Sequence, residues 1–88
     1  MNTTSRLRDG SSLPRVRAVT RAIAILRAFT SGRPHLALGE IVKLTGLDAG
    51  TTRRLLVTLR DEGLIRQDPA TGLYSASIGL LELSRAVP

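Results

Sequence analysis

The residues of this chain that carry binding chemistry form one short stretch, which consists of Ala49, Gly50, Thr51, Thr52, Arg53 and Arg54. The two small residues leave room for close approach by a ligand. The two hydroxyls can hydrogen-bond a phosphate oxygen or a base edge, and a threonine methyl can contact the methyl group of thymine. A guanidinium presents a planar fork of donors that matches both phosphate and guanine. We therefore expect all six residues to lie at a DNA interface.

Two apolar-periodic runs with a sharp break between them position this stretch. In residues 38–45 the apolar positions recur at spacings of three and four, which predicts a helix. Gly46 can close that helix in a left-handed conformation, and Asp48 can accept the free amides of a second helix as its N-cap. The second helix runs over residues 49–62 and ends before Gly63. Helices joined by so tight a turn cross steeply, so the pattern predicts a helix-turn-helix motif.

The second helix has one apolar face, which consists of Thr52, Leu55, Leu56 and Leu59. Arg53 then points outward, toward guanine, where a bidentate pair supplies about 1–3 kcal/mol of discrimination. Because a helix turns by about 100° per residue, Arg54 points elsewhere, to a phosphate or to a carboxylate of the domain such as Glu40. In the alternative interpretation both arginines are solvated on the helix face and Thr51 only aids the helix cap.

The charge of the chain supports a polyanionic partner. Its 88 residues carry a net charge of +6 with a sequence pI near 11.5. Twelve of the thirteen basic residues are arginine, and the remaining one is Lys43. Such an excess favours nucleic acid or an anionic surface, although a solubilising charge on a small domain is the alternative.

Composition bounds the other function classes. The chain has no cysteine, one histidine (His35), no clustered carboxylate pair and no glycine loop that cradles phosphate. We therefore expect no enzyme activity, no catalytic residue, no metal and no cofactor. No window approaches the roughly 20 apolar residues of a membrane span, and no signal peptide is evident. These features predict one small aliphatic domain in the cytoplasm, without a membrane partner.

The segments before the helix pair are predicted to be an arm and a helix. Residues 1–15 are rich in Ser, Thr, Gly, Pro and Arg, which predicts a disordered basic arm. Its arginines can follow phosphates or enter a minor groove, and a solvated tail is the alternative. A helix over residues 16–30 follows, and its apolar stripe consists of Val19, Ala22, Ile23, Leu26 and Phe29. Ala24, Ile25 and Ala28 widen this face, so we expect the helix to pack against more than one neighbour.

After the helix pair the pattern changes to that of a β-hairpin. Residues 64–68 and 73–76 are strand candidates, separated by a turn that contains proline and glycine. A hairpin directly after a helix-turn-helix motif forms a wing, so the fold class is mainly α with a small β-hairpin, a winged helix-turn-helix. We expect Arg66 to touch the DNA backbone, Tyr74 to pack on the core, and Leu36 to make a short extended contact beside the wing.

The last segment, residues 77–88, is predicted to be helical. Its apolar side chains are too numerous for a lone terminal helix to keep from water. It therefore packs back on the first helix, pairs with a second subunit, or leads into a further domain.

These residues resemble the winged-helix N-terminal domain of the IclR family of bacterial transcription regulators. The resemblance runs from about Val16 to Leu83 and rests on blocks in the family's order, which are Arg21–Leu26, Leu38–Ile41, Thr45–Leu47, Thr51–Leu59, Gly63–Ile65 and Tyr74. Any one block is weakly diagnostic, whereas their order and spacing together are specific. The chain departs from the family at Ala49 and Gly50, where Lys and Ser are common.

The resemblance implies a sequence-specific DNA-binding repressor, less often an activator, that binds palindromic operators as a dimer or tetramer. It implies a domain over residues 16–76 with its recognition helix, 49–62, in the major groove and its wing, 64–76, near the backbone. Residues 77–88 correspond to a linker helix, which would join a homodimer or a partner regulator subunit. The family also has a C-terminal ligand-sensing domain beyond this helix. We expect either the DNA-binding half of a regulator or a regulator that lacks the effector domain.

A second function class remains open at this stage. The winged helix can be a protein-interaction module that docks on a full-length regulator and poisons its dimers. In that case the leucines of the last helix, Leu80, Leu81 and Leu83, form the docking surface.

Overall fold

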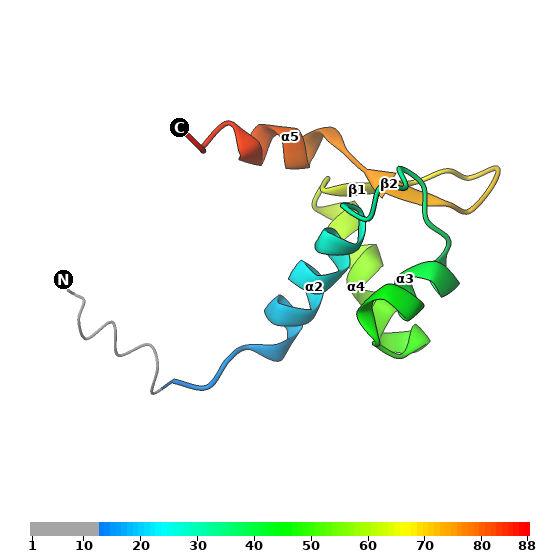
Figure 1. The fold of residues 1–88 in the computed structure, drawn as a ribbon, viewed down its shortest axis with the longest axis horizontal. Coiled ribbons are helices and arrows are strands. Elements are labelled where there is room, and N and C mark those ends of the chain that lie inside the picture. Colours follow the sequence, from blue (N-terminus) through cyan, green and yellow to red (C-terminus); the bar gives the residue numbers. More distant parts are fainter. Residues whose placement is uncertain (1–12) are drawn as a thin grey trace.

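The structure of the protein, a computed structural model, describes residues 13–88 (Figure 1). Its elements in chain order are α2 (Arg17–Ala28), α3 (Leu38–Thr45), α4 (Ala49–Asp61), β1 (Ile65–Gln67), β2 (Tyr74–Ala76) and α5 (Ile78–Ser84). Three helices, a two-stranded hairpin and a terminal helix thus confirm the predicted winged helix-turn-helix fold. The predicted arm lies outside the described residues, except for the exposed residues 13–15.

A small aliphatic core lies where α2, α3 and α4 pack against one another and against the hairpin. The buried apolar side chains are Ile25, Ala28, Leu36, Ile41, Leu56, Leu59, Ile65 and Tyr74. Every described element except α5 contributes one or two of them, so the core joins all of these elements. Because α4 supplies both Leu56 and Leu59, this helix is anchored on one face and open on the other.

Helix α2 buries only part of its predicted apolar face. Ile25 and Ala28 are buried, and Ala22, Leu26 and Phe29 pack against the core. In contrast, Val19 and Ile23, predicted to be buried, are 56% and 43% exposed. The physical reason is that apolar residues occupy more than half of the circumference of this helix. Periodicity therefore cannot select the buried side, which is decided by the direction from which α3 and α4 approach.

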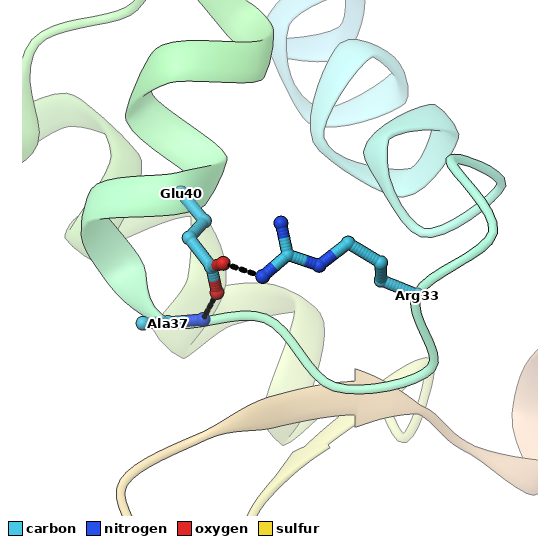
Figure 2. Close-up of polar contacts among 3 residues, drawn as sticks. All are labelled: Arg33, Ala37 and Glu40. Atoms are coloured by element: carbon cyan, nitrogen blue, oxygen red, sulfur yellow. Dashed lines mark hydrogen bonds and ion pairs between the residues drawn. The ribbon is translucent and has the colours of Figure 1, made fainter.

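The start of α3 is held by a carboxylate rather than by an N-cap side chain, because Ala37 has none to offer. One oxygen of Glu40, Oε1, accepts a hydrogen bond from the Ala37 amide at 2.8 Å, and Oε2 forms an ion pair with Arg33 (Figure 2). At the other end Gly46 adopts φ 76°, the left-handed cap predicted from sequence. Helix α3 therefore has the predicted bounds despite its weak N-cap.

The wing is a short antiparallel hairpin in which Ile65 pairs with Ala76 and Gln67 with Tyr74. Its strands are shorter than predicted, with three residues each. Leu36 adds an isolated bridge to Tyr74, with backbone N–H···O distances of 2.9 and 2.8 Å. This bridge confirms the predicted contact of Leu36 beside the wing, and it ties the hairpin to the loop before α3.

Helix α5 contacts β1 and extends past the hairpin, away from the three-helix core (Figure 1). It buries no side chain, and Ile78, Leu81 and Leu83 are more than half exposed. Its docking point is Gly79, where an added Cβ would overlap the carbonyl of Gly63. Of the three alternatives for this segment, packing on the first helix is therefore not the one that the structure shows. Among the described helices, none is long and apolar enough to cross a membrane.

Candidate nucleic-acid interface

The start of α4 is fixed by Asp48, which has extended backbone dihedrals and acts as the N-cap. Its Oδ1 accepts a hydrogen bond from the Thr51 amide at 2.8 Å, and its Oδ2 accepts one from the Thr51 hydroxyl at 2.9 Å. The amide bond is the largest cause that lowers the pKa of Asp48 from its ordinary value, followed by the hydroxyl bond. The carboxylate is therefore ionised at the helix end where the macrodipole favours negative charge. The predicted N-cap role of Asp48 is confirmed.

The six candidate residues divide by their exposure. Four of them are exposed (Ala49, Gly50, Arg53 and Arg54), Thr51 is half-buried, and Thr52 is fully buried. They come from the first two turns of α4, which are the turns that the core leaves open.

Thr52 is a correction to the predicted interface. Its side chain has no exposed surface, and its hydroxyl donates a hydrogen bond to the Asp48 carbonyl at 2.8 Å. The position shares a helix face with Leu56 and Leu59, which places it toward the core. Thr52 therefore satisfies its polar group inside the domain and has no surface to offer a nucleic acid.

Thr51 combines two roles that the sequence left open. Its amide and hydroxyl both donate to Asp48, which makes it part of the helix cap. Because the hydroxyl proton is used in the cap, the oxygen is left as an acceptor, and Arg54 approaches it at 3.4 Å. In this arrangement the Thr51 hydroxyl has no free donor for a partner.

The two arginines differ in what they contact. Arg54 lies over the start of its own helix, beside Thr51 and close enough to Asp48 to lower the pKa of that carboxyl. The alternative in which Arg54 pairs with Glu40 is wrong, because Arg33 holds that carboxylate. Arg53 is exposed and forms no ion pair with any carboxylate within residues 13–88. In contrast to Arg54, Arg53 therefore keeps its guanidinium donors available to a partner.

The hairpin places its two candidate residues on opposite sides. Arg66 lies in the middle of β1, opposite Ser75, and is exposed. Tyr74 is 5% exposed and belongs to the core, which confirms its predicted structural role. The wing therefore offers a guanidinium to the outside while its aromatic residue holds it to the domain.

Sequence reasoning missed two basic residues beside this helix end. Arg17 and Arg21 of α2 line the same cleft as Thr51 and Arg54. A signal was available, because positions four apart share one helix face, so these two arginines had to lie together. Their nearness to α4 was not available, since it depends on the packing of α2. Across residues 13–88 no three His, Cys, Asp or Glu side chains gather as a metal site would require.

A helix pair joined by a tight turn, a capped second helix with an open basic end, and a two-stranded wing together define a winged helix-turn-helix DNA-binding domain. The sequence model of the IclR helix-turn-helix domain matches residues 18–69. The chain therefore belongs to the IclR family of helix-turn-helix transcription regulators, as its sequence blocks implied.

Individual relatives support the same assignment. The chain is 38% identical over 68 residues to the glycerol operon regulatory protein of Streptomyces coelicolor, covering 77% of this chain and 27% of that protein. It is 35% identical over 52 residues to the transcriptional repressor IclR of Escherichia coli, covering 59% and 19%. The crystal structure of an IclR family transcriptional regulator from Brucella abortus matches with a TM-score of 0.78 and 42% identity, covering 82% and 27%. The chain thus spans about a quarter or less of the length of these three proteins.

Proposed function

We propose that this protein is a sequence-specific DNA-binding repressor whose helix α4 enters the major groove. The observation that carries the proposal is Arg53, an exposed guanidinium at the open, capped end of α4 that has no carboxylate partner among residues 13–88. In the proposed complex it binds guanine, whose O6 and N7 acceptors match its fork. Repression, rather than activation, is supported by the similarity to the transcriptional repressor IclR of Escherichia coli.

The other exposed candidates have positioning roles in this proposal. Ala49 and Gly50 carry little or no side chain, so the helix end can approach the bases closely. Thr51 contacts a thymine methyl, Arg54 contacts phosphate, and Arg66 on the wing (64–76) contacts the backbone beside the groove. Phosphate contacts fix the register on the duplex, whereas Arg53 reads sequence. Such a regulator works in the cytoplasm, where bacterial DNA is accessible.

The experiment that tests this proposal is selection of bound duplexes from a random DNA pool by the full 88-residue chain. We expect a common motif that contains guanine at the Arg53 contact. If two copies bind together, the motif is an inverted repeat with half-sites one helical turn apart, or multiples of it. A pool that stays random after repeated selection would contradict sequence-specific binding.

A second candidate function is favoured by the exposed apolar side chains of α5. Leu81 and Leu83 are 54% and 60% exposed, and Leu80 is half-buried. This surface suits a second copy of the chain, which gives a homodimer, or the matching helix of a full-length regulator, whose dimers it would poison. Sizing the chain alone and mixed with a full-length relative tests both partners. A monomer in both samples would dispose of this candidate while leaving DNA binding intact.

A further inference from the structure

A cleft between the first turns of α2 and α4 has an unusually basic lining. Its volume is about 370 Å³, and its walls consist of Arg17, Ala18, Arg21, Thr51, Arg54, Leu55 and Thr58. Of the side chains of residues 13–88, three guanidinium groups line the cleft and no carboxylate does. Arg17, Arg54 and Thr58 are exposed, so the cleft opens at the surface. The two walls come from elements far apart in the sequence, so the cleft cannot be predicted from the sequence alone.

The charges on the α2 wall oppose the local stability of that helix. Arg17 and Arg21 stand four residues apart on one face, and like charges at this spacing destabilise a helix. Both lie near the N-terminal end of α2, where the macrodipole disfavours positive charge, and the first turn contains no acidic residue. Local rules broken in this way are expected at functional positions rather than at structural ones.

Nothing in the described domain neutralises these charges. Within residues 13–88 the ion pairs are Arg33 with Glu40 and Arg60 with Asp61, and neither involves the cleft. Arg54 has Asp48 nearby, but both oxygens of that carboxylate already accept hydrogen bonds from Thr51. The Thr58 hydroxyl is also occupied, since it donates to the Arg54 carbonyl at 3.3 Å. The guanidinium groups of Arg17 and Arg21 are therefore the donors that remain for a ligand, and that ligand must be an anion.

We propose that this cleft binds a phosphate of the DNA backbone, with Arg17 and Arg21 of α2 and Arg54 of α4 as its donors. The inference deepens the proposed function and rests on it, because the cleft shares Thr51 and Arg54 with the end of α4. A duplex carries one negative charge per about 1.7 Å of its axis, so a helix end in the major groove has backbone phosphates on its flank. Helix α2 then anchors the strand beside the groove that α4 reads.

The test is the salt dependence of DNA binding by Arg17→Gln, Arg21→Gln and the matched control Arg27→Gln. All three remove one positive charge from α2, but Arg27 lies in its last turn and does not line the cleft. Affinities for a selected site and for a random duplex are measured from about 50 to 200 mM salt, where phosphate contacts make DNA binding strongly salt-dependent. Circular dichroism of each variant confirms that the domain is folded.

We expect each cleft variant to make the negative slope of log K against log salt less steep, by up to about 0.9, the value for one lost phosphate contact, while Arg27→Gln leaves the slope unchanged. Both duplexes should lose affinity by the same factor, because a phosphate contact carries no sequence information. If the cleft variants match Arg27→Gln while the parent protein binds its site, the phosphate inference is overturned and the proposed function stands. If the parent protein binds no duplex, both are overturned.

A second arm separates a DNA phosphate from a free anion. Inorganic phosphate is titrated into the isotope-labelled chain without DNA, and the amide signals of Ala18 and Thr51 are followed by NMR. Weak chemical-shift changes that do not saturate would support a phosphate site that is complete only when the duplex is bound. Saturable binding of inorganic phosphate, together with unchanged salt slopes in the cleft variants, would assign the cleft to a free anion and overturn the inference.

Discussion

The carboxylate of Asp48 receives two hydrogen bonds from one residue, Thr51, through its amide at 2.8 Å and its hydroxyl at 2.9 Å. This pair decides where α4 begins and which side of its first turn is open. An N-cap accepts the amides that have no partner inside the helix, so the start of the helix is well defined rather than frayed. A rigid helix end is what a side chain such as Arg53 requires in order to meet a base in one orientation.

Removal of the cap should weaken the domain. We expect Asp48→Ala to lower the midpoint of thermal unfolding by several degrees, because the amides at the start of α4 lose their acceptor. Asp48→Asn should keep most of the stability, since the asparagine side chain also accepts at an N-cap. Thermal melts followed by circular dichroism measure both. Equal losses for the two variants would contradict a role that depends on a hydrogen-bond acceptor.

The same pair predicts a dependence on pH. The Thr51 amide lowers the pKa of Asp48 below the ordinary value of 3.8, so folding favours the ionised carboxylate. This stabilisation is complete above that value and is lost as the pH falls through the lower, folded-state pKa. Asp68 behaves alike, because the Ala70 amide lowers its pKa. We expect the stability of Asp48→Asn to fall less steeply than that of the parent protein as the pH drops below about 4. The remaining decrease comes in part from Asp68. Thermal melts over this pH range measure the effect, and the same pH dependence of stability in the variant and the parent protein would contradict this prediction.

Arg53→Ala should remove sequence preference. The lost bidentate pair costs about 1–3 kcal/mol on the selected site, whereas binding to random duplex should change little at fixed salt. Arg60→Ala, in the last turn of the same helix, is the matched control and should keep the preference. Titrations on both duplexes measure the ratio of affinities. An equal loss on both would assign Arg53 to a phosphate instead.

Thr52→Val tests the correction at the interface. The substitution keeps the shape of a fully buried side chain but removes the hydroxyl that donates to the Asp48 carbonyl. We expect a loss of about 0.5–1.5 kcal/mol in the free energy of unfolding and no change in DNA affinity at a temperature where the variant is folded. Chemical denaturation and DNA titration give the two numbers. A large affinity loss in the folded variant would return Thr52 to the interface.

Two glycine substitutions should have opposite signs. At Gly39 of α3 an added Cβ meets no atom within 4 Å, so Gly39→Ala should stabilise the domain by about 0.5–1 kcal/mol. At Gly79 the Cβ would overlap the Gly63 carbonyl and lie 3.2 Å from Leu64, so Gly79→Ala should displace α5. Urea denaturation and the NMR signals of Gly63 and Leu64 check this. Unshifted signals in Gly79→Ala would contradict the docking of α5 at that point.

Much of the fold was predictable because its signals are local. Gly46 and Asp48 each serve a backbone requirement that their own side chains, or the lack of one, identify. Tyr74 and Leu36 were also placed correctly. Thr52 was assigned both to the apolar face of the helix and to the DNA interface. Its helical spacing from Leu56 already favoured the apolar face, since a residue on that face cannot also face DNA.

The remainder depends on packing between distant segments. The ion pair of Arg33 with Glu40, which rules out the proposed partner of Arg54, joins a loop to a helix that follows it. Which part of the broad apolar face of α2 is buried follows from where its neighbours approach, and this leaves Val19 and Ile23 exposed. That same packing brings Arg17 to α4. No periodicity in the sequence carries this information.

The most direct test of the proposed binding mode is methylation interference on a selected site. Methylation at guanine N7 modifies the major-groove edge that Arg53 is proposed to read, whereas methylation at adenine N3 modifies the minor groove. We expect N7 methylation at one guanine to block binding of the parent protein and to have no effect on binding of Arg53→Ala. Binding that ignores N7 methylation but is blocked by N3 methylation would contradict a recognition helix in the major groove.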